Sequence, residues 1–211
     1  MLVTEDYDFR DFNSIVAESG FRVRVTQDSA YAVAVTADDN LTDFLDVFRS
    51  GSTLHLEIKP NNGVSFSALR ADVRMPFFSS AVLSAGASCD LGDGFVSYDP
   101  ASAVLSAGSR LEGSLRSGDV SFVLSGGSNL LLRGAGRNGS LVASGGSQID
   151  LRNFVLDSAS VTADGGSTVY VNLTGRIDAT VSGGSNVYYT GTPEFGEINV
   201  SSGSTFKRLG G

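Results

Sequence analysis

The stretches LSGGSNLLL (124–132), ASGGSQIDL (143–151), ADGGSTVYV (163–171) and VSGGSNVYY (181–189) decide the fold of this 211-residue chain. Each places a Gly-Gly corner between two short apolar runs, and LSAGASCDL (83–91), LSAGSRLEG (105–113) and VSSGSTFKR (200–208) extend the series at both ends. The anchor glycines follow one another after 22, 19, 19, 20, 18 and 19 residues: Gly86, Gly108, Gly127, Gly146, Gly166, Gly184 and Gly203. An internal repeat of this period predicts a solenoid.

Positions within the repeat alternate between apolar and polar residues. The third residue after the anchor glycine is apolar in every copy, as are the third and the fifth residues before it. These three columns run from Cys89 to Phe206, from Leu83 to Val200 and from Ala81 to Ile198. The second residue after the anchor is polar in every copy. Because side chains alternate across a strand, each repeat is predicted to form two strands joined at the glycine corner, with the apolar columns inside.

The predicted fold class is all-β: a single-domain right-handed parallel β-helix, or β-solenoid, with coils of about 19–20 residues. Parallel crossover connections are right-handed in about 98% of cases, and the strict hexapeptide pattern of left-handed solenoids is absent from the sequence. We expect one domain over residues 1–211, with regular SGGS-type repeats at 83–208.

A column of serines directly follows the anchor glycines, from Ser109 to Ser204. If the alternation continues through the corner, these hydroxyl groups point inward and can form hydrogen bonds from coil to coil. A nucleophilic serine would need a base, and the only histidine in the chain is His55. We therefore interpret the serines as a structural ladder.

Residues 1–82 break this register and are predicted to form irregular strands and a cap helix. Residues 21–27 (FRVRVTQ) and 31–37 (YAVAVTA) alternate around Asp28-Ser29, which predicts two strands joined by a short turn, and residues 53–59 and 68–75 also resemble strands. Asn40 is expected to cap a short helix that covers an end of the stack, since solenoid ends expose apolar core. The apolar face of that helix would consist of Leu41, Phe44, Leu45 and Phe48.

The charge balance limits the partners. With 15 basic and 23 acidic residues, the net charge is -8, so we expect neither nucleic acid nor an anionic membrane as a partner. Cys89 is the only cysteine, which excludes an intrachain disulfide. No stretch is apolar enough to be a membrane-spanning segment, and residues 1–9 (MLVTEDYDF) are not a secretion leader.

The chain resembles the autotransporter adhesin head GIN domain family, a bacterial family of unknown molecular function. The resemblance rests on the opening DFRDFNSIVAESGFRVRVTQ (8–27), on VAVTADDNLTDFLDV (33–47) and on the SGGS repeats. It implies a β-helix in an extracytoplasmic location, secreted or anchored at the cell surface, and a role as an adhesin-like or structural binding module. It brings no catalytic, cofactor or metal-binding residues. Ala-Gly replaces Gly-Gly at the first two corners, which departs from the family pattern.

A carbohydrate-active β-helix enzyme, similar to a polysaccharide lyase or hydrolase, is the alternative. Asp90 and Glu112 are predicted to face outward on adjacent coils. Such enzymes need clustered carboxylates, often with Ca²⁺ or a basic residue, and the sequence shows no Asp-Asp pair or Arg-Lys cluster beside these two. We therefore predict that the chain is not an enzyme and has no cofactor or metal site.

The candidate contact surface consists of Tyr170 and Tyr188, which occupy the same outward position in consecutive repeats, with Tyr189 adjacent and Leu131 in the same column. Strands stack about 4.8 Å apart, so the two rings are expected to lie together as a small aromatic platform. A surface glycan or a protein could bind there, or the strip could join two copies in a homo-oligomer. Ring stacking that only stabilises the sheet is the competing interpretation.

Overall fold

The computed structural model describes residues 1–60, 67–201 and 203–210, and these residues form two sheets that face each other. In spatial order, sheet A consists of β1 (Leu2–Tyr7), β4 (Ala32–Asp38), β7 (Leu69–Met75), β3 (Arg22–Gln27), β9 (Ser88–Asp90), β12 (Arg110–Arg116), β14 (Asn129–Ala135), β16 (Gln148–Leu156), β18 (Thr168–Leu173), β20 (Asn186–Gly191) and β22 (Thr205–Arg208), with β10 (Phe95–Val96) beside β12. Sheet B consists of β21 (Glu194–Val200), β19 (Arg176–Val181), β17 (Ser158–Ala163), β15 (Asn138–Ala143), β13 (Val120–Leu124), β11 (Ala101–Leu105), β8 (Ser80–Leu83), β2 (Ser14–Ala17), β6 (Thr53–Ile58) and β5 (Leu45–Ser50).

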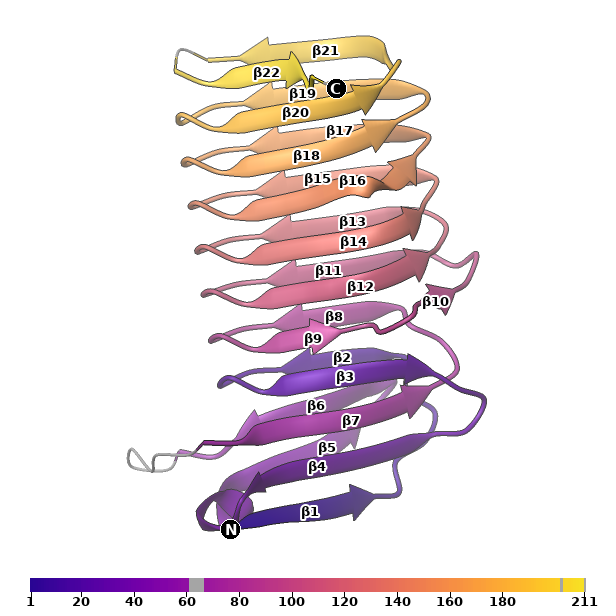
Figure 1. Cartoon of the computed structure of the whole chain (residues 1–211), viewed down its shortest axis with the longest axis vertical. Coiled ribbons are helices and arrows are strands. Elements are labelled where there is room, and N and C mark those ends of the chain that lie inside the picture. Colours follow the sequence, from indigo (N-terminus) through magenta and orange to yellow (C-terminus); the bar gives the residue numbers. More distant parts are fainter. Residues whose placement is uncertain (61–66, 202, 211) are drawn as a thin grey trace.

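The coil is a right-handed parallel solenoid, as predicted. For the coils from β8 onward, Figure 1 shows the strands of sheet A running from left to right in front and the fainter strands of sheet B running from right to left behind, while the chain rises toward the C-terminus. From β8 onward, each strand pairs in parallel with the equivalent strand of the next coil, so that Leu111 lies opposite Leu130 and Leu105 opposite Leu124. The two-strand repeat inferred from the sequence is therefore the structural unit.

The predicted inward columns form the core between the sheets. From Cys89 to Val187, from Leu83 to Val181 and from Ala81 to Ala179, no member is more than 3% exposed. The last coil differs, because no further coil covers it among the described residues. There Val200 is 44% exposed, and Ile198 and Phe206 are only partly buried.

In the corners from Ala85-Gly86 to Gly183-Gly184, two successive residues have positive φ. Gly126 and Gly127 have φ of 60° and 75°, a combination that glycine adopts without steric cost. Ala85 and Ala107 occupy the first corner position of the two Ala-Gly copies with φ of 49° and 50°. The replacement of glycine therefore leaves the shape of these corners unchanged.

The serines after the corners form the predicted ladder. Ser109, Ser128, Ser147, Ser167 and Ser185 are all at most 1% exposed. The N–H of Ser109 donates to Ser128 Oγ at 3.3 Å, and the N–H of Ser128 donates to Ser147 Oγ at 3.2 Å. The hydroxyl groups of Ser109, Ser128 and Ser167 also donate within their own coils, as Ser128 Oγ does to Ser125 O at 2.8 Å. The hydroxyl groups are held in structural hydrogen bonds.

The N-terminal region contains a coil in the repeat register, which the sequence analysis missed. Ile15 and Ala17 of β2 lie opposite Ala81 and Leu83, and the N–H of Gly20 donates to Ala85 O at 3.0 Å, as the anchor glycines do between later coils. The chain then steps outward through β4 and β5 and returns as β6–β7, which stacks on the outer side of β2–β3. The strands predicted at 21–27 and 31–37 exist, but β7 lies between them.

The predicted cap helix is shorter than expected. Residues Asp39–Phe44 form a 3₁₀ helix, η1, beside β1 and β4 at the N-terminal end of the stack. Asn40 lies inside this helix, and Asp38 precedes it at the N-cap position without a capping hydrogen bond from its side chain. Leu45 and Phe48 belong to β5, because pairing with β6 replaces a second helical turn. Only Leu41 of the predicted face is a buried helical residue.

Candidate functional site

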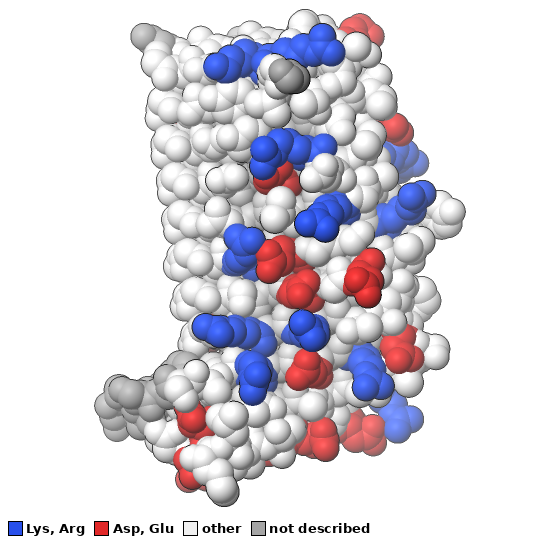
Figure 2. Space-filling model, in the orientation of Figure 1, with Lys and Arg blue, Asp and Glu red and all other residues white. Residues whose placement is uncertain are grey.

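The two outer faces of the solenoid differ in chemistry. Between β8 and β17, the outward positions of sheet B are uncharged: Ser80, Val82, Ser102, Val104, Ser121, Val123, Asn138, Ser140, Val142, Ser158, Ser160 and Thr162. The outward positions of sheet A between β7 and β22 carry nine basic residues: Arg22, Arg24, Arg70, Arg74, Arg110, Arg116, Arg133, Arg152 and Lys207. Only four are acidic: Asp72, Asp90, Glu112 and Asp150. Figure 2 shows this face, where basic and acidic side chains are interspersed along the stack.

Tyr170 and Tyr188 lie on this face, side by side on neighbouring strands. They are paired in the register of β18 and β20, and the residues on either side of each in sequence face the interior. Their ring centroids are 5.2 Å apart and their planes are inclined by 17°, so the rings stack face to face along the solenoid axis. The structure therefore brings the two predicted site residues together.

Cations cover the outer ring faces of this stack. Arg152 Cζ lies 4.8 Å from the centroid of Tyr170, and Lys207 Nζ lies 5.3 Å from the centroid of Tyr188. Each ring thus has one face against its neighbour and one against a cation. The surface offered to a partner consists of ring edges, hydroxyl groups and cations, which differs from the flat platform that the sequence predicts.

A bulge in β16 places Arg152 over Tyr170. The pairing of β16 with β18 jumps from Leu151 to Val155, which leaves Arg152 outside the regular register. Its guanidinium group donates from Nε to Asp150 Oδ1 at 2.9 Å and from Nη2 to Asp150 Oδ2 at 2.5 Å. Burial acts to raise the pKa of Asp150, but hydrogen bonds from the side chain and backbone of Arg152 outweigh it and lower that pKa. Arg152 is therefore held in place by a charged carboxylate.

Tyr189 and Leu131 belong to different surroundings. Tyr189 points toward the interior of the last coils, where its ring lies 5.1 Å from that of Phe206 and 5.3 Å from that of Phe195. Leu131 shares the outward column of Tyr170 but is two strands away, with Asp150 between them. Neither extends the tyrosine pair.

The carboxylates considered for catalysis lie together. Asp90 and Glu112 are paired between β9 and β12, and both line a depression of about 460 Å³ with Asp93 and Arg133. Arg110 holds Glu112, with Nη2 2.6 Å from Oε2, and Asp90 Oδ1 accepts the N–H of Gly92 at 2.8 Å. Both carboxylates therefore have structural partners. Within the described residues, no group of three or more His, Cys, Asp or Glu side chains is placed to hold a metal ion.

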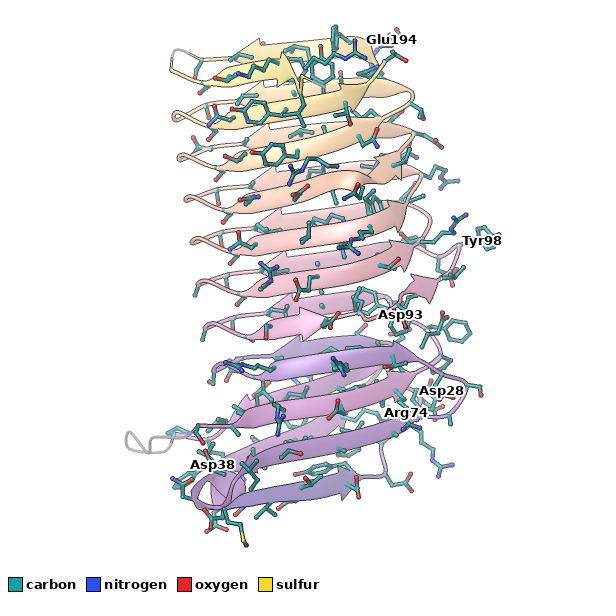
Figure 3. The ribbon with its side chains drawn as sticks, in the orientation of Figure 1. Asp28, Asp38, Arg74, Asp93, Tyr98 and Glu194 are labelled. Carbon is teal, nitrogen blue, oxygen red and sulfur yellow. The ribbon has the colours of Figure 1, made fainter. Side chains whose placement is uncertain are left out.

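The sequence analysis did not identify two exposed features of the structure. Phe77, Val96 and Tyr98 are 57%, 58% and 91% exposed, and Figure 3 shows Tyr98 projecting from the edge of the stack. Gln27 joins their segments, donating to Pro76 O at 2.9 Å and accepting the N–H of Val96 at 3.1 Å.

The second feature is the basic character of sheet A. It depends on the position of β3 and β7 beside β9 in the sheet. The repeat spacing does not predict that position, because both strands precede the regular repeats.

Comparison with solved structures supports the fold. A putative adhesin from Bacteroides fragilis NCTC 9343 superposes with a TM-score of 0.90 at 20% identity, covering 99% of this chain and 97% of that one. A putative adhesin from Parabacteroides merdae ATCC 43184 gives 0.71 at 15% identity, covering 99% and 96%. A protein from Parabacteroides distasonis ATCC 8503 described as a putative lipid binding protein gives 0.70 at 16% identity, covering 99% and 97%. Likeness at these identities establishes the solenoid fold alone.

The family assignment comes from the sequence match. No curated protein matches the chain. In the part of the chain that the structure describes, no helix has the length and apolar character needed to cross a bilayer. Residues 11–193 match the family described as "Putative auto-transporter adhesin, head GIN domain". The match covers most of the solenoid, from β2 to β20. The chain belongs to this adhesin head GIN domain family.

Proposed function

We propose that this chain is a non-catalytic binding module, secreted or held at the bacterial cell surface, whose ligand contacts the outer face of sheet A at Tyr170 and Tyr188. The proposal rests on the exposure and the hydrogen bonding of the tyrosine pair. Both side chains are partly exposed on a rigid sheet, and neither phenol hydroxyl group has a hydrogen-bond partner among the described residues. Tyrosines with an apolar body and a free polar tip are favoured at binding surfaces.

The other features of the face support a ligand that binds from outside. The interior between the sheets is filled by the apolar columns and the serine ladder, which leaves the strand faces as the binding surfaces. The adhesin names of the family and of its structural relatives agree with such a role.

Replacement of both tyrosines tests the proposal. The Tyr170→Ala, Tyr188→Ala variant should keep the melting temperature within a few degrees, since each ring stabilises the sheet by about 1 kcal/mol or less. It should lose binding to immobilised glycans or to whole cells in a plate assay. The matched control is Phe77→Ala with Tyr98→Ala, which removes two exposed rings from the edge. Binding that survives in the tyrosine variant and disappears in the control would place the site at the edge instead.

Glycan cleavage at Asp90 and Glu112 is the second candidate, because both line one depression with Asp93 and Arg133. An enzyme of this kind releases reducing or unsaturated sugar ends from a polysaccharide, and Asp90→Asn with Glu112→Gln would abolish that release. We expect no release by the unmodified chain, since Arg110 neutralises Glu112. Product formation that the double variant loses would favour the enzyme over the binding module.

A further inference from the structure

The outer face of sheet A has an unusual balance of charge. The whole chain carries a net charge of -8, yet the part of this face between β7 and β22 carries nine of its fifteen basic residues, against four acidic ones. Net charge therefore does not describe what a ligand meets here. The local field of this face favours an anion.

The strongest basic group lies on β3 and β7. Within the described residues, Arg22, Arg24, Arg70 and Arg74 are exposed and have no carboxylate within ion-pair distance. The other basic side chains of the face include Arg110 and Arg152, which are bound to Glu112 and Asp150. The unpaired guanidinium groups keep all their donors available.

Two of these arginines are direct neighbours of like charge. Arg22 and Arg70 are register partners on β3 and β7, and the next position in their column is Ser88, followed by Arg110. Like charges directly opposite each other destabilise a sheet. An oxyanion between the two guanidinium groups would remove that repulsion and accept paired hydrogen bonds from each.

The surface beside this pair is hollowed. One depression of about 400 Å³ is lined by Gly20, Arg22, Ser67, Ala68, Leu69 and Arg70, none of which is acidic. A second, of about 390 Å³, shares Arg22 and Arg70 and extends over Ser88 toward Arg110, and its lining also includes Asp72, Asp90 and Glu112. The small side chain of Ser88 keeps the column open between the flanking arginines. Together the depressions offer a path along the sheet.

The acidic residues on the path limit the charge density of the ligand. Asp72 and Asp90 lie on either side of Arg24 in the register, and Glu112 follows. In double-stranded DNA each strand carries a phosphate about every 3.4 Å of helix axis, closer than the spacing of about 4.8 Å between β-strands, so phosphates would lie against these carboxylates. A sugar polymer carries neutral hydroxyl groups beside its carboxylates, and these hydroxyl groups can donate hydrogen bonds to the acidic side chains. Five strand steps separate β3 from β18, so a chain of several sugars spanning about 24 Å would also reach the tyrosine pair.

We propose that the outer face of sheet A binds a linear acidic polysaccharide along the solenoid axis, with sugar carboxylates held by Arg22 and Arg70. This inference rests on the proposed function, since it names the ligand chemistry of the same face. Arg24, Arg74 and Lys207 add unpaired positive charge along the path. The hydroxyl groups of Tyr170 and Tyr188 provide hydrogen bonds at the far end.

Titration with polygalacturonate, a polymer of one carboxylate per sugar, tests the proposal, with its methyl ester as the uncharged control. The unmodified chain should bind polygalacturonate, lose affinity as NaCl rises from about 0.05 to 0.5 M, and ignore the ester. Arg22→Gln with Arg70→Gln should weaken binding by about tenfold or more, since two charge-assisted contacts are lost. Arg10→Gln with Arg49→Gln changes the net charge equally on other surfaces and should leave affinity unchanged. Arg22→Lys with Arg70→Lys retains the charge and should keep part of the affinity even if the glutamine variant unfolds.

Several outcomes would overturn the proposal. They are no binding of polygalacturonate, equal binding of the ester, equal losses in the two glutamine variants, or tighter binding of a single-stranded oligonucleotide of the same charge. Unchanged affinity in both the glutamine and the lysine variants of Arg22 and Arg70 would do the same. If Tyr170→Ala with Tyr188→Ala abolishes cell or glycan binding while the arginine variants bind normally, only the acidic ligand is wrong and the proposed function stands.

Discussion

At the scale of single residues, glycines serve two different purposes in this solenoid. Gly146 has φ of 76°, and a Cβ added there would meet nothing within 4 Å, so its role is conformational. Gly134 has φ of 124°, and a Cβ there would overlap the carbonyl oxygen of Leu115 on the neighbouring strand. The corner glycine permits a backbone conformation, whereas Gly134 also permits close contact between coils.

Alanine substitutions should separate these purposes. Gly146→Ala should lower the free energy of unfolding by about 1 kcal/mol, the cost of a positive φ with a side chain. Gly134→Ala should lower it by about 3 kcal/mol or more, because strain and overlap add. Urea denaturation of both variants measures the difference. Equal losses would mean that the close approach at Gly134 relaxes without cost.

The serine ladder makes a second prediction at this scale. Ser128→Ala removes the acceptor of the Ser109 N–H and should destabilise the fold by about 1–3 kcal/mol, since a buried donor is left unpaired. Ser121→Ala, on the outer face of sheet B, is the matched control and should change stability by less than about 0.5 kcal/mol. Similar thermal melts for both variants would show that the ladder adds nothing to stability.

At the scale of elements, the regular coils could be predicted from sequence and the N-terminal ones only in part. Alternation identified both the buried columns and the adjacency of Tyr170 and Tyr188, because both follow from period and register. The coil of β2 and β3 has the same corner as later copies. Gly20 precedes Gly86 by 66 residues, however, so the repeat period does not predict where this coil lies in the stack. In the sequence, the bulge that carries Arg152 over Tyr170 is visible only as a repeat of 20 residues after two repeats of 19. The extra residue does not predict the direction of a side chain.

Strand position along the stack should set local stability. Central strands such as β14 and β16 pair on both sides, whereas β1, β5, β21 and β22 each pair with one strand. Backbone groups at open edges exchange through local fraying, so hydrogen exchange should be fastest in peptides from β1, β5, β21 and β22 and slowest in those from β14 to β16. Exchange at one uniform rate along the stack would contradict this order.

At the scale of the whole molecule, the solenoid separates two surfaces that a net charge of -8 conceals. Sheet A presents cations and tyrosine edges, while the middle of sheet B presents serine, valine and threonine. Parallel stacking sets the outward side chains in columns along the axis, so an elongated ligand would contact side chains from several coils at once. The fold thereby provides an elongated binding face without a deep pocket, which suits a polymer.

The most direct test of this account compares the two faces with matched charge changes. Arg22→Gln with Arg70→Gln removes two positive charges from sheet A, and Val104→Glu with Val123→Glu adds two negative charges to sheet B, so each variant lowers the net charge by two. Binding of each folded variant to cells that the unmodified chain binds is then measured by flow cytometry. The account predicts that the sheet A variant loses binding and the sheet B variant keeps it. Loss of binding in the sheet B variant, with full binding in the sheet A variant, would contradict it.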